Sequence, residues 1–510
     1  MSIASSSPSG SDGCRFLHKS ILLLMAALVL MGAFCAGCRS RRTIKKAEKL
    51  YQRGVSYCDG EEAPVDYAMA ADLFRQAAEL GNADAQAQLG GCYLSGMGVK
   101  FDLVSAEKWL RKAAKRGNPY GCMWLADLLW GRGDYQEILA LRRQAVDGWR
   151  QLAEDGDGKA QFMLAKCYEK GIGVRVNVDE QVKWLKAAAE QDYCDAQFSL
   201  ACCYAQGNGV PQDLDEFLKW LKKAAAHRTG AIAQFVLGGC FEIGLGVPQD
   251  LEKANYWYAK SLENTLAYAS QGSAGAQFGM FDFYKNGIGV QKDPDEARRW
   301  LRKYLETERT HVKSGAPEAM YSLHWLYSGV WDTALKNDGK AKRWLKKAVR
   351  KYRELAEQGD AQGQGMLGAA LRYYRPEATD WGLSDDPGRE AVEWLEQAVE
   401  QQHANAYLQL GHCYMAGNGV EQDSHKGARY YRLAAERELS SYYAFMYLAM
   451  CYREGVGMPQ DSEKARIWDS LAFVFAMDAE KRASIQERLE KMYYAALPAP
   501  APTAAGEDWY

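Results

Sequence analysis

The sequence predicts an all-α protein, an α/α solenoid of about ten or eleven antiparallel helical hairpins. Three features that recur in phase along the chain predict this fold. A glycine directly precedes a loop valine, or Met458 in the last copy, at spacings of 36 to 43 residues or multiples of them: Gly98, Gly173, Gly209, Gly246, Gly289, Gly419 and Gly457. Three residues after the valine stands a helix-capping residue: Asp102, Asn177, Asp213, Asp250, Asp293, Asp423 and Asp461. Seven residues after each cap stands an aromatic: Trp109, Trp184, Trp220, Trp257, Trp300, Tyr430 and Trp468.

The stretch from Ala196 to Ala226 shows one complete unit. Its first half places Ala196, Leu200, Cys203 and Tyr204 on one helical stripe, and its second half does the same with Phe217, Trp220, Leu221 and Ala224. Between them, Gly207 is placed to close the first helix in the left-handed conformation, and Asp213 is placed to cap the second. We expect the tryptophans of the second helices to lie in the core.

The N-terminal residues resemble a lipoprotein-type export signal. Residues 1–38 combine a Ser/Gly-rich start, expected to be disordered, with an apolar run that ends in Ala36-Gly37-Cys38. Cys38 is the residue that would be lipidated. The alternative is an uncleaved membrane anchor, which the basic residues after Cys38 favour, with the solenoid in the cytoplasm. On either interpretation the solenoid is tethered to a membrane.

After Cys38 the sequence predicts a linker, the solenoid and a tail. Residues 39–46 form a basic juxtamembrane linker, and 47–496 form the solenoid, whose first hairpin is incomplete and whose third, at about 119–157, is decayed. Regular hairpins begin near Gly158, Cys194 and Ala231, and units from Ala274 are longer, with extra helix at 303–311. The units near Pro317 and Ala361 have irregular loops, and a polar helix at about 478–496 caps the end. Residues 497–510 form a disordered Pro/Ala-rich tail.

Composition and motifs exclude several classes of function. The net charge of −2 gives no global field for nucleic acid. The glycine loops lack the Lys and hydroxyl residue of a phosphate-binding loop, and the histidines lack metal-ligand spacing, so we expect no cofactor and no metal. Six cysteines share one repeat position and are expected to be small buried residues without disulfides: Cys92, Cys167, Cys203, Cys240, Cys413 and Cys451.

Leu200-Ala-Cys-Cys-Tyr204, Gly207-Asn-Gly-Val210, Asp213 and Lys219-Trp220 resemble the Sel-like repeat (SLR), a relative of the tetratricopeptide repeat. The pattern recurs from about residue 47 to 476. The resemblance implies a helical superhelix whose members act mostly as adaptors that hold protein complexes together. Some secreted bacterial members have been credited with penicillin binding or β-lactam hydrolysis.

One fragment resembles a serine β-lactamase site. Ser105-Ala-Glu-Lys108 matches the S-x-x-K motif, and Lys313-Ser-Gly315 resembles K-T-G, but no Ser-Asp-Asn element exists. Other repeats carry Glu or Lys at the Ser105 position, so the match is interpreted as an accident. An envelope enzyme or peptidoglycan-binding protein remains the alternative to a non-catalytic scaffold.

A repeated Gln-Phe pair is the stripe that could face a protein partner. It comprises Gln161 and Phe162, Gln197 and Phe198, Gln234 and Phe235, and Gln277 and Phe278. Packing between neighbouring hairpins is the favoured interpretation of this stripe. The sequence thus predicts a membrane-anchored interaction scaffold in a bacterial envelope, facing the periplasm or exterior, with an unidentified protein partner.

Overall fold

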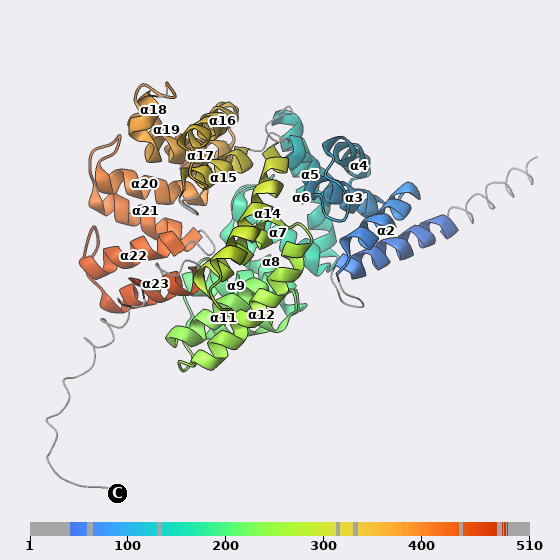
Figure 1. The fold of residues 1–510 in the computed structure, drawn as a ribbon, viewed down its shortest axis with the longest axis horizontal. Coiled ribbons are helices and arrows are strands. Elements are labelled where there is room, and N and C mark those ends of the chain that lie inside the picture. Colours follow the sequence, from blue (N-terminus) through green and yellow to red (C-terminus); the bar gives the residue numbers. More distant parts are fainter. Residues whose placement is uncertain are drawn as a thin grey trace, which may run out of the picture.

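The computed structural model describes residues 41–58, 65–129, 135–312, 317–329, 335–380, 382–437 and 442–476, together with 482, 484, 485 and 487. Within these residues the regular structure is helical and contains no strand, as predicted. Apart from the short α18 (Arg375–Asp380), which lies between α17 and α19 in the sequence, the described helices pair into eleven antiparallel hairpins (Figure 1). The pairs are 41–58 with α2 (Tyr67–Glu79), α3 (Ala83–Ser95) with α4 (Leu103–Lys115), α5 (Pro119–Leu129) with α6 (Tyr135–Glu154), α7 (Gly158–Lys170) with α8 (Val178–Glu190), α9 (Cys194–Gln206) with α10 (Leu214–Ala226), α11 (Ala231–Ile243) with α12 (Leu251–Ser270), α13 (Ala274–Asn286) with α14 (Pro294–Val312), α15 (Pro317–Ser328) with α16 (Asp338–Glu357), α17 (Ala361–Tyr373) with α19 (Pro387–Glu400), α20 (Ala404–Ala416) with α21 (Ser424–Arg437), and α22 (Tyr442–Glu454) with α23 (Ser462–Phe475).

The loop of each regular hairpin is held by the residues that the periodicity identified. At the end of α9, Gly207 adopts φ 73° and its N–H donates to the carbonyl of Cys203. At the start of α10, Asp213 accepts from the backbone N–H groups of residues 215 and 216 at 2.9 and 3.0 Å. Asp250 caps α12 in the same way, at 2.9 Å from the N–H of Lys253. The predicted caps therefore satisfy backbone donors that the helix leaves unpaired.

The glycine before the loop valine is needed for a different reason. All seven of these glycines have φ between 63° and 75°. In addition, each lies directly against the second helix of the preceding hairpin: a Cβ atom would overlap the carbonyl oxygen of Tyr67 at Gly98, of Gly388 at Gly419 and of Ser424 at Gly457. Stacking thus brings the loop backbone into contact with the neighbouring helix, which only glycine permits.

The tryptophans correct one expectation about the core. Trp220 and Trp300 are buried, at 8% and 4% exposure. Trp109, Trp184 and Trp257 are only partly buried. Each of these rings has a lysine of the same helix over it: Lys112 over Trp109 at 4.0 Å from the ring centroid, Lys183 over Trp184 at 4.9 Å and Lys260 over Trp257 at 5.2 Å. These rings therefore close the edge of the core while a lysine covers the side that faces water.

The hairpins wind into a superhelix whose successive turns touch. The side-chain amide of Gln271 donates to the carbonyl of Val65 at 3.2 Å, and its oxygen accepts from the N–H of Tyr67 at 3.3 Å. Further along, Arg142 approaches Asp360 at 3.8 Å. Residues that touch between successive turns lie 204 to 240 positions apart in the sequence, so one turn of the superhelix contains about six hairpins.

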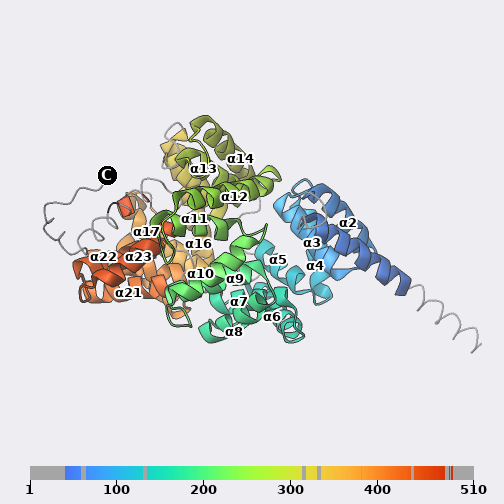
Figure 2. The ribbon, with the colours of Figure 1, turned by 90° about the horizontal axis from the view of Figure 1, so that it is seen from below.

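The C-terminal hairpins pack on the middle of the chain. Helix α23 lies against α11, and Figures 1 and 2 show the red C-terminal helices beside the green ones. Arg482, in the region expected to form a capping helix, is buried and pairs with Glu242 and the hydroxyl of Tyr258. Its guanidinium also lies 4.2 Å from the centroid of the Phe473 ring. Most of the predicted capping helix lies outside the described residues.

The start of the solenoid differs from the prediction. Residues 41–46, expected to be a linker, belong to the helix that runs to residue 58. Arg and Lys have high helix propensity, so a basic composition does not prevent a helix. The predicted signal at 1–38 and the tail at 497–510 lie outside the described residues.

The glycine contacts lead to a paired test. Gly417→Ala should cost about 1 kcal/mol of unfolding free energy, because Gly417 has φ 66° and its nearest neighbour, the Cβ of Gln422, would be 3.3 Å from the new methyl. Gly419→Ala adds an overlap with the Gly388 carbonyl and should cost roughly 1 to 3 kcal/mol more. Denaturant unfolding of both variants measures the difference. Equal losses would show that the close approach between hairpins does not constrain this position.

Candidate functional site

The four glutamines of the predicted stripe are buried between helices. Gln161, Gln197, Gln234 and Gln277 are 0–6% exposed. Each donates its side-chain amide to a carbonyl near the end of the preceding helix, as Gln161 does to Ala153 at 3.1 Å. The oxygen of Gln161 accepts from Gln191 of the next helix at 2.8 Å. This burial agrees with the favoured interpretation, packing between hairpins, and not with glutamines that face a partner; these side chains join consecutive helices.

The four phenylalanines occupy different environments. Phe235 is buried against Tyr258, with ring centroids 5.3 Å apart. Phe162 and Phe198 are partly buried and lie against aromatic neighbours, Phe198 against Phe475 of the C-terminal hairpin at 6.5 Å. Phe278 lies beside Tyr304 at 5.2 Å and lines a cavity. Among these four phenylalanines, Phe278 therefore lines the larger of the cavities that the stripe reaches.

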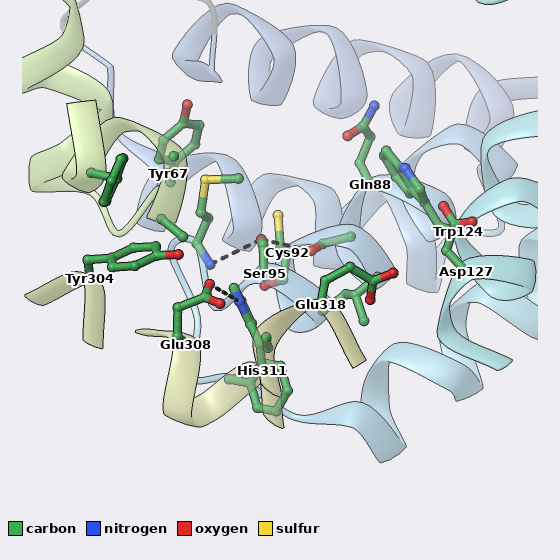
Figure 3. Close-up of a pocket in the computed structure, with 18 of the residues that line it drawn as sticks. Tyr67, Gln88, Cys92, Ser95, Trp124, Asp127, Tyr304, Glu308, His311 and Glu318 are labelled. Atoms are coloured by element: carbon green, nitrogen blue, oxygen red, sulfur yellow. Dashed lines mark hydrogen bonds and ion pairs between the residues drawn. The ribbon is translucent and has the colours of Figure 1, made fainter. Parts of the chain in front are cut away.

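A cleft of about 900 Å³ lies where the two turns of the superhelix meet. One wall comes from α2, α3 and α5, and the other from α13, α14 and α15. Figure 3 shows Glu308 and Glu318 facing Cys92 and Ser95, with Trp124 and Asp127 beyond them on one side and Tyr304 on the other. Segments about 200 residues apart in the sequence thus build one site, which we call the inter-turn cleft.

A second hollow of about 460 Å³ adjoins the first at Gly275. It is lined mainly by small and apolar residues of α9, α11, α12 and α13, among them Ile232, which is 66% exposed. Gly275 lines both hollows, and a Cβ added there would meet no atom within 4 Å. We call the two hollows together the inner groove. The volume of each hollow by itself is in the range of ligand sites in proteins.

The inter-turn cleft concentrates carboxyl groups. Glu308 is 7% exposed and lies 3.4 Å from the ring nitrogen of His311. Glu318 accepts from the amide of Gln362 at 2.9 Å. Burial, together with the nearby carboxylates of Asp360, Asp127 and Glu308, raises the pKa of Glu318 to about 7. Burial also raises the pKa of Asp127, against the opposing charge of Arg142, although half of its side chain still meets the water of the cleft.

These cleft residues carried no repeated sequence signal. Glu308 and His311 belong to the extra helix at 303–311 that the sequence revealed, but nothing in the sequence indicated that it meets the first hairpins. Glu318 begins one of the two irregular units. The three carboxylates of the cleft, Asp127, Glu308 and Glu318, therefore all lie in units that depart from the repeat pattern.

The predicted cysteine position is buried as a free thiol. Cys92, Cys167, Cys203, Cys240, Cys413 and Cys451 are buried, and none of the described cysteines is in a disulfide. Burial raises the pKa of Cys92 to about 11 and that of Cys203 to about 12. Such thiols stay protonated at neutral pH and are poor nucleophiles.

The described histidines do not gather into a metal site. Burial lowers the pKa of His403 to about 4 and that of His412 to about 3, so both rings are neutral at pH 7. His412 accepts or donates a hydrogen bond with the hydroxyl of Tyr431 at 2.8 Å. No group of three His, Cys, Asp or Glu side chains among the described residues is placed to hold a metal ion.

The β-lactamase-like fragment has a local role at a helix cap. The Ser105 hydroxyl donates to the carboxylate of Asp102 at 2.6 Å, within the cap of α4. Lys108 lies in the same helix and is exposed. Lys313, Ser314 and Gly315 lie outside the described residues. The structure thus accounts for Ser105 by capping.

Glu318 should make stability depend on pH. Its folded pKa, about 7, lies above the ordinary value of 4.5, so the stability that its protonated form provides is present below pH 4.5 and is lost as the pH rises to 7. Between pH 5 and 8 the unfolding free energy of the wild type should therefore fall relative to that of Glu318→Gln, by at most ~3 kcal/mol. Denaturant unfolding at four pH values measures this, with Glu454→Gln as the exposed control. Parallel curves for wild type and Glu318→Gln would contradict the burial of this carboxyl.

The repeats along the chain match a known protein family. The family model described as Sel1 repeat matches 46–82, 83–118, 158–193, 194–227, 231–265, 274–303, 317–351, 365–403, 404–439 and 444–470. These segments cover well over half of the chain. The stretch they omit between 118 and 158 is the predicted decayed hairpin, which the structure fills with α5 and α6.

Curated relatives match over short regions. Chitin synthase regulatory factor 3 of Schizosaccharomyces pombe is 29% identical over 155 residues, 29% of this chain and 17% of that protein. The Sel1-repeat-containing protein YjcO of Escherichia coli is 29% identical over 119 residues, 22% of this chain and 50% of that protein. The chain therefore spans at most half the length of these relatives.

Solved structures of repeat proteins also match. The c5321 protein of uropathogenic Escherichia coli, described as displaying an SLR fold, is 26% identical and covers 92% of this chain and 99% of its own, with a TM-score of 0.30. A Sel1 repeat protein from Oxalobacter formigenes is 26% identical, covers 50% and 96%, and has a TM-score of 0.33. These scores carry no argument about how the turns are arranged. The family is shown instead by the repeat matches along the sequence, and the chain belongs to the Sel1 repeat family.

Proposed function

We propose that the protein is a non-catalytic interaction scaffold that binds a segment of a partner protein in its inner groove. The observation that carries this proposal is that the inter-turn cleft and the second hollow adjoin at Gly275, which lines both. An elongated groove lined mainly by apolar side chains fits an extended or helical peptide. The nucleophiles described above are not activated: the thiols of the repeated cysteine position are buried, and the Ser105 hydroxyl is engaged in capping.

The alternative, an envelope enzyme or a peptidoglycan- or β-lactam-binding protein, has only the short Ser105 motif in its favour. Turnover of a reporter β-lactam that disappears in Ser105→Ala would establish that alternative and overturn the scaffold-only proposal.

We also propose membrane tethering through Cys38, supported by the Ala36-Gly37-Cys38 sequence after an apolar run. None of the described helices combines the length and the apolar character that crossing a bilayer requires. Lipid labelling of the wild type should be lost in Cys38→Ser, with the protein moving from the membrane fraction to the soluble fraction. A Cys38→Ser protein that stays in the membrane without label would instead support an uncleaved anchor.

Binding in the groove is tested by filling it. Gly275 is the second residue of α13 and faces open space, so Gly275→Phe places a ring in the groove without a clash and without loss of helix. Gly339 is the second residue of α16 and is exposed, which makes Gly339→Phe a matched control. A photoreactive residue at position 88, in the wall of the cleft, reports contact with the partner in living cells.

The expected result is a cross-linked partner in the wild-type background that persists with Gly339→Phe and is strongly reduced with Gly275→Phe. Thermal unfolding of the three proteins shows whether each is folded. An equal yield of cross-linked partner in both glycine variants would overturn binding through the groove.

A further inference from the structure

We propose that the inter-turn cleft binds a cationic side chain of the partner segment, an arginine in preference to a lysine, with apolar residues on either side of it. This inference rests on the proposed function, because it names the chemistry of the segment that the groove takes. Three observations carry it: the charge of the cleft, its aromatic walls and the second hollow that adjoins it at Gly275.

The charge of the cleft is one-sided. Asp127, Glu308 and Glu318 line it, and no lysine or arginine is found among the described residues that do so. A ring nitrogen of His311 lies 3.4 Å from Glu308, and the guanidinium of Arg142 lies 3.8 Å from Asp127. The partner of Glu318 is the neutral amide of Gln362, which leaves its charge uncompensated. Burial destabilises the ionised form of Glu318, and a cation placed beside this carboxylate would stabilise that form.

Aromatic side chains lie beside this acidic wall. Trp124, Phe278, Tyr304, Phe101 and Tyr67 line the same cleft. Phe278 and Tyr304 form a tilted pair with centroids 5.2 Å apart, and Phe101 lies 6.2 Å from the ring of His311. A guanidinium can stack on an aromatic face while it donates two hydrogen bonds to a carboxylate, which an ammonium cannot do. Carboxylates next to aromatic rings therefore favour arginine.

The rest of the groove indicates that this cation belongs to a longer chain. At Gly275 the cleft adjoins the second hollow, whose lining includes Phe198, Ile232 and Phe283. Residues next to the arginine can bury apolar side chains there. A bare metal ion fits less well, because no three ligating side chains among the described residues converge on one point.

The test uses two labelled peptides and the purified full-length chain in detergent. One peptide carries a single arginine between two phenylalanines, and the other has glutamine in place of the arginine. Fluorescence anisotropy should give an affinity about tenfold higher for the arginine peptide, as expected for a charge-assisted hydrogen bond at a partly buried site. Glu318→Gln should remove most of this difference, whereas Glu454→Gln, on an exposed residue of α22, should retain it.

Three results would overturn the inference: equal affinity for both peptides, a preference for arginine that survives in both Glu318→Gln and Glu308→Gln, or binding of neither peptide. Cross-linking at position 88 to a second copy of this chain would do so as well, because the occupant would then be the protein itself. If both peptides bind equally and Gly275→Phe abolishes that binding, the charge preference is refuted but the groove remains the binding site. If binding depends on the arginine but Gly275→Phe does not change it, the peptide lies outside the inner groove. That result would count against both proposals.

Discussion

The close approach of each glycine loop to the second helix of the preceding hairpin is the constraint on which the rest of the structure depends. At Gly98, Gly419 and Gly457 the loop backbone lies where a Cβ atom would overlap a carbonyl oxygen. This contact fixes how far apart consecutive hairpins stack. Because the same contact recurs from unit to unit, it also sets the rotation between them, and small rotations add up to the superhelix.

The longer second helices determine where successive turns meet. Helices α12 and α14 have 20 and 19 residues, whereas α8 and α10 have 13. Gln271, at the end of α12, reaches Val65 and Tyr67, and His311, in the last turn of α14, reaches Phe101. The extra helical turns therefore form the seam between superhelical turns, and the inter-turn cleft lies along that seam.

Glutamines and glutamates show how a repeat protein separates stability from recognition. The glutamine at the Gln161 position occurs in several units and always bonds a carbonyl of the preceding helix, so it carries no information about a partner. Glu308 and Glu318 each occur once, in units that depart from the pattern, and both face open space. Residues that break the repeat are therefore the better guide to the site.

The sequence by itself determined the all-α class, the hairpin boundaries, the caps at positions such as Asp213 and Asp250, and the burial of the cysteines, because each depends on neighbours within one or two repeats. Tertiary structure decided the features that depend on contacts about 200 residues away: the seam, the pairing of Arg482 with Glu242, and the cleft around Glu318. It also decided that three tryptophans lie at the edge of the core. Local periodicity gives the spacing of helices along the chain, but the small rotation between hairpins accumulates over a whole turn before it brings distant residues together.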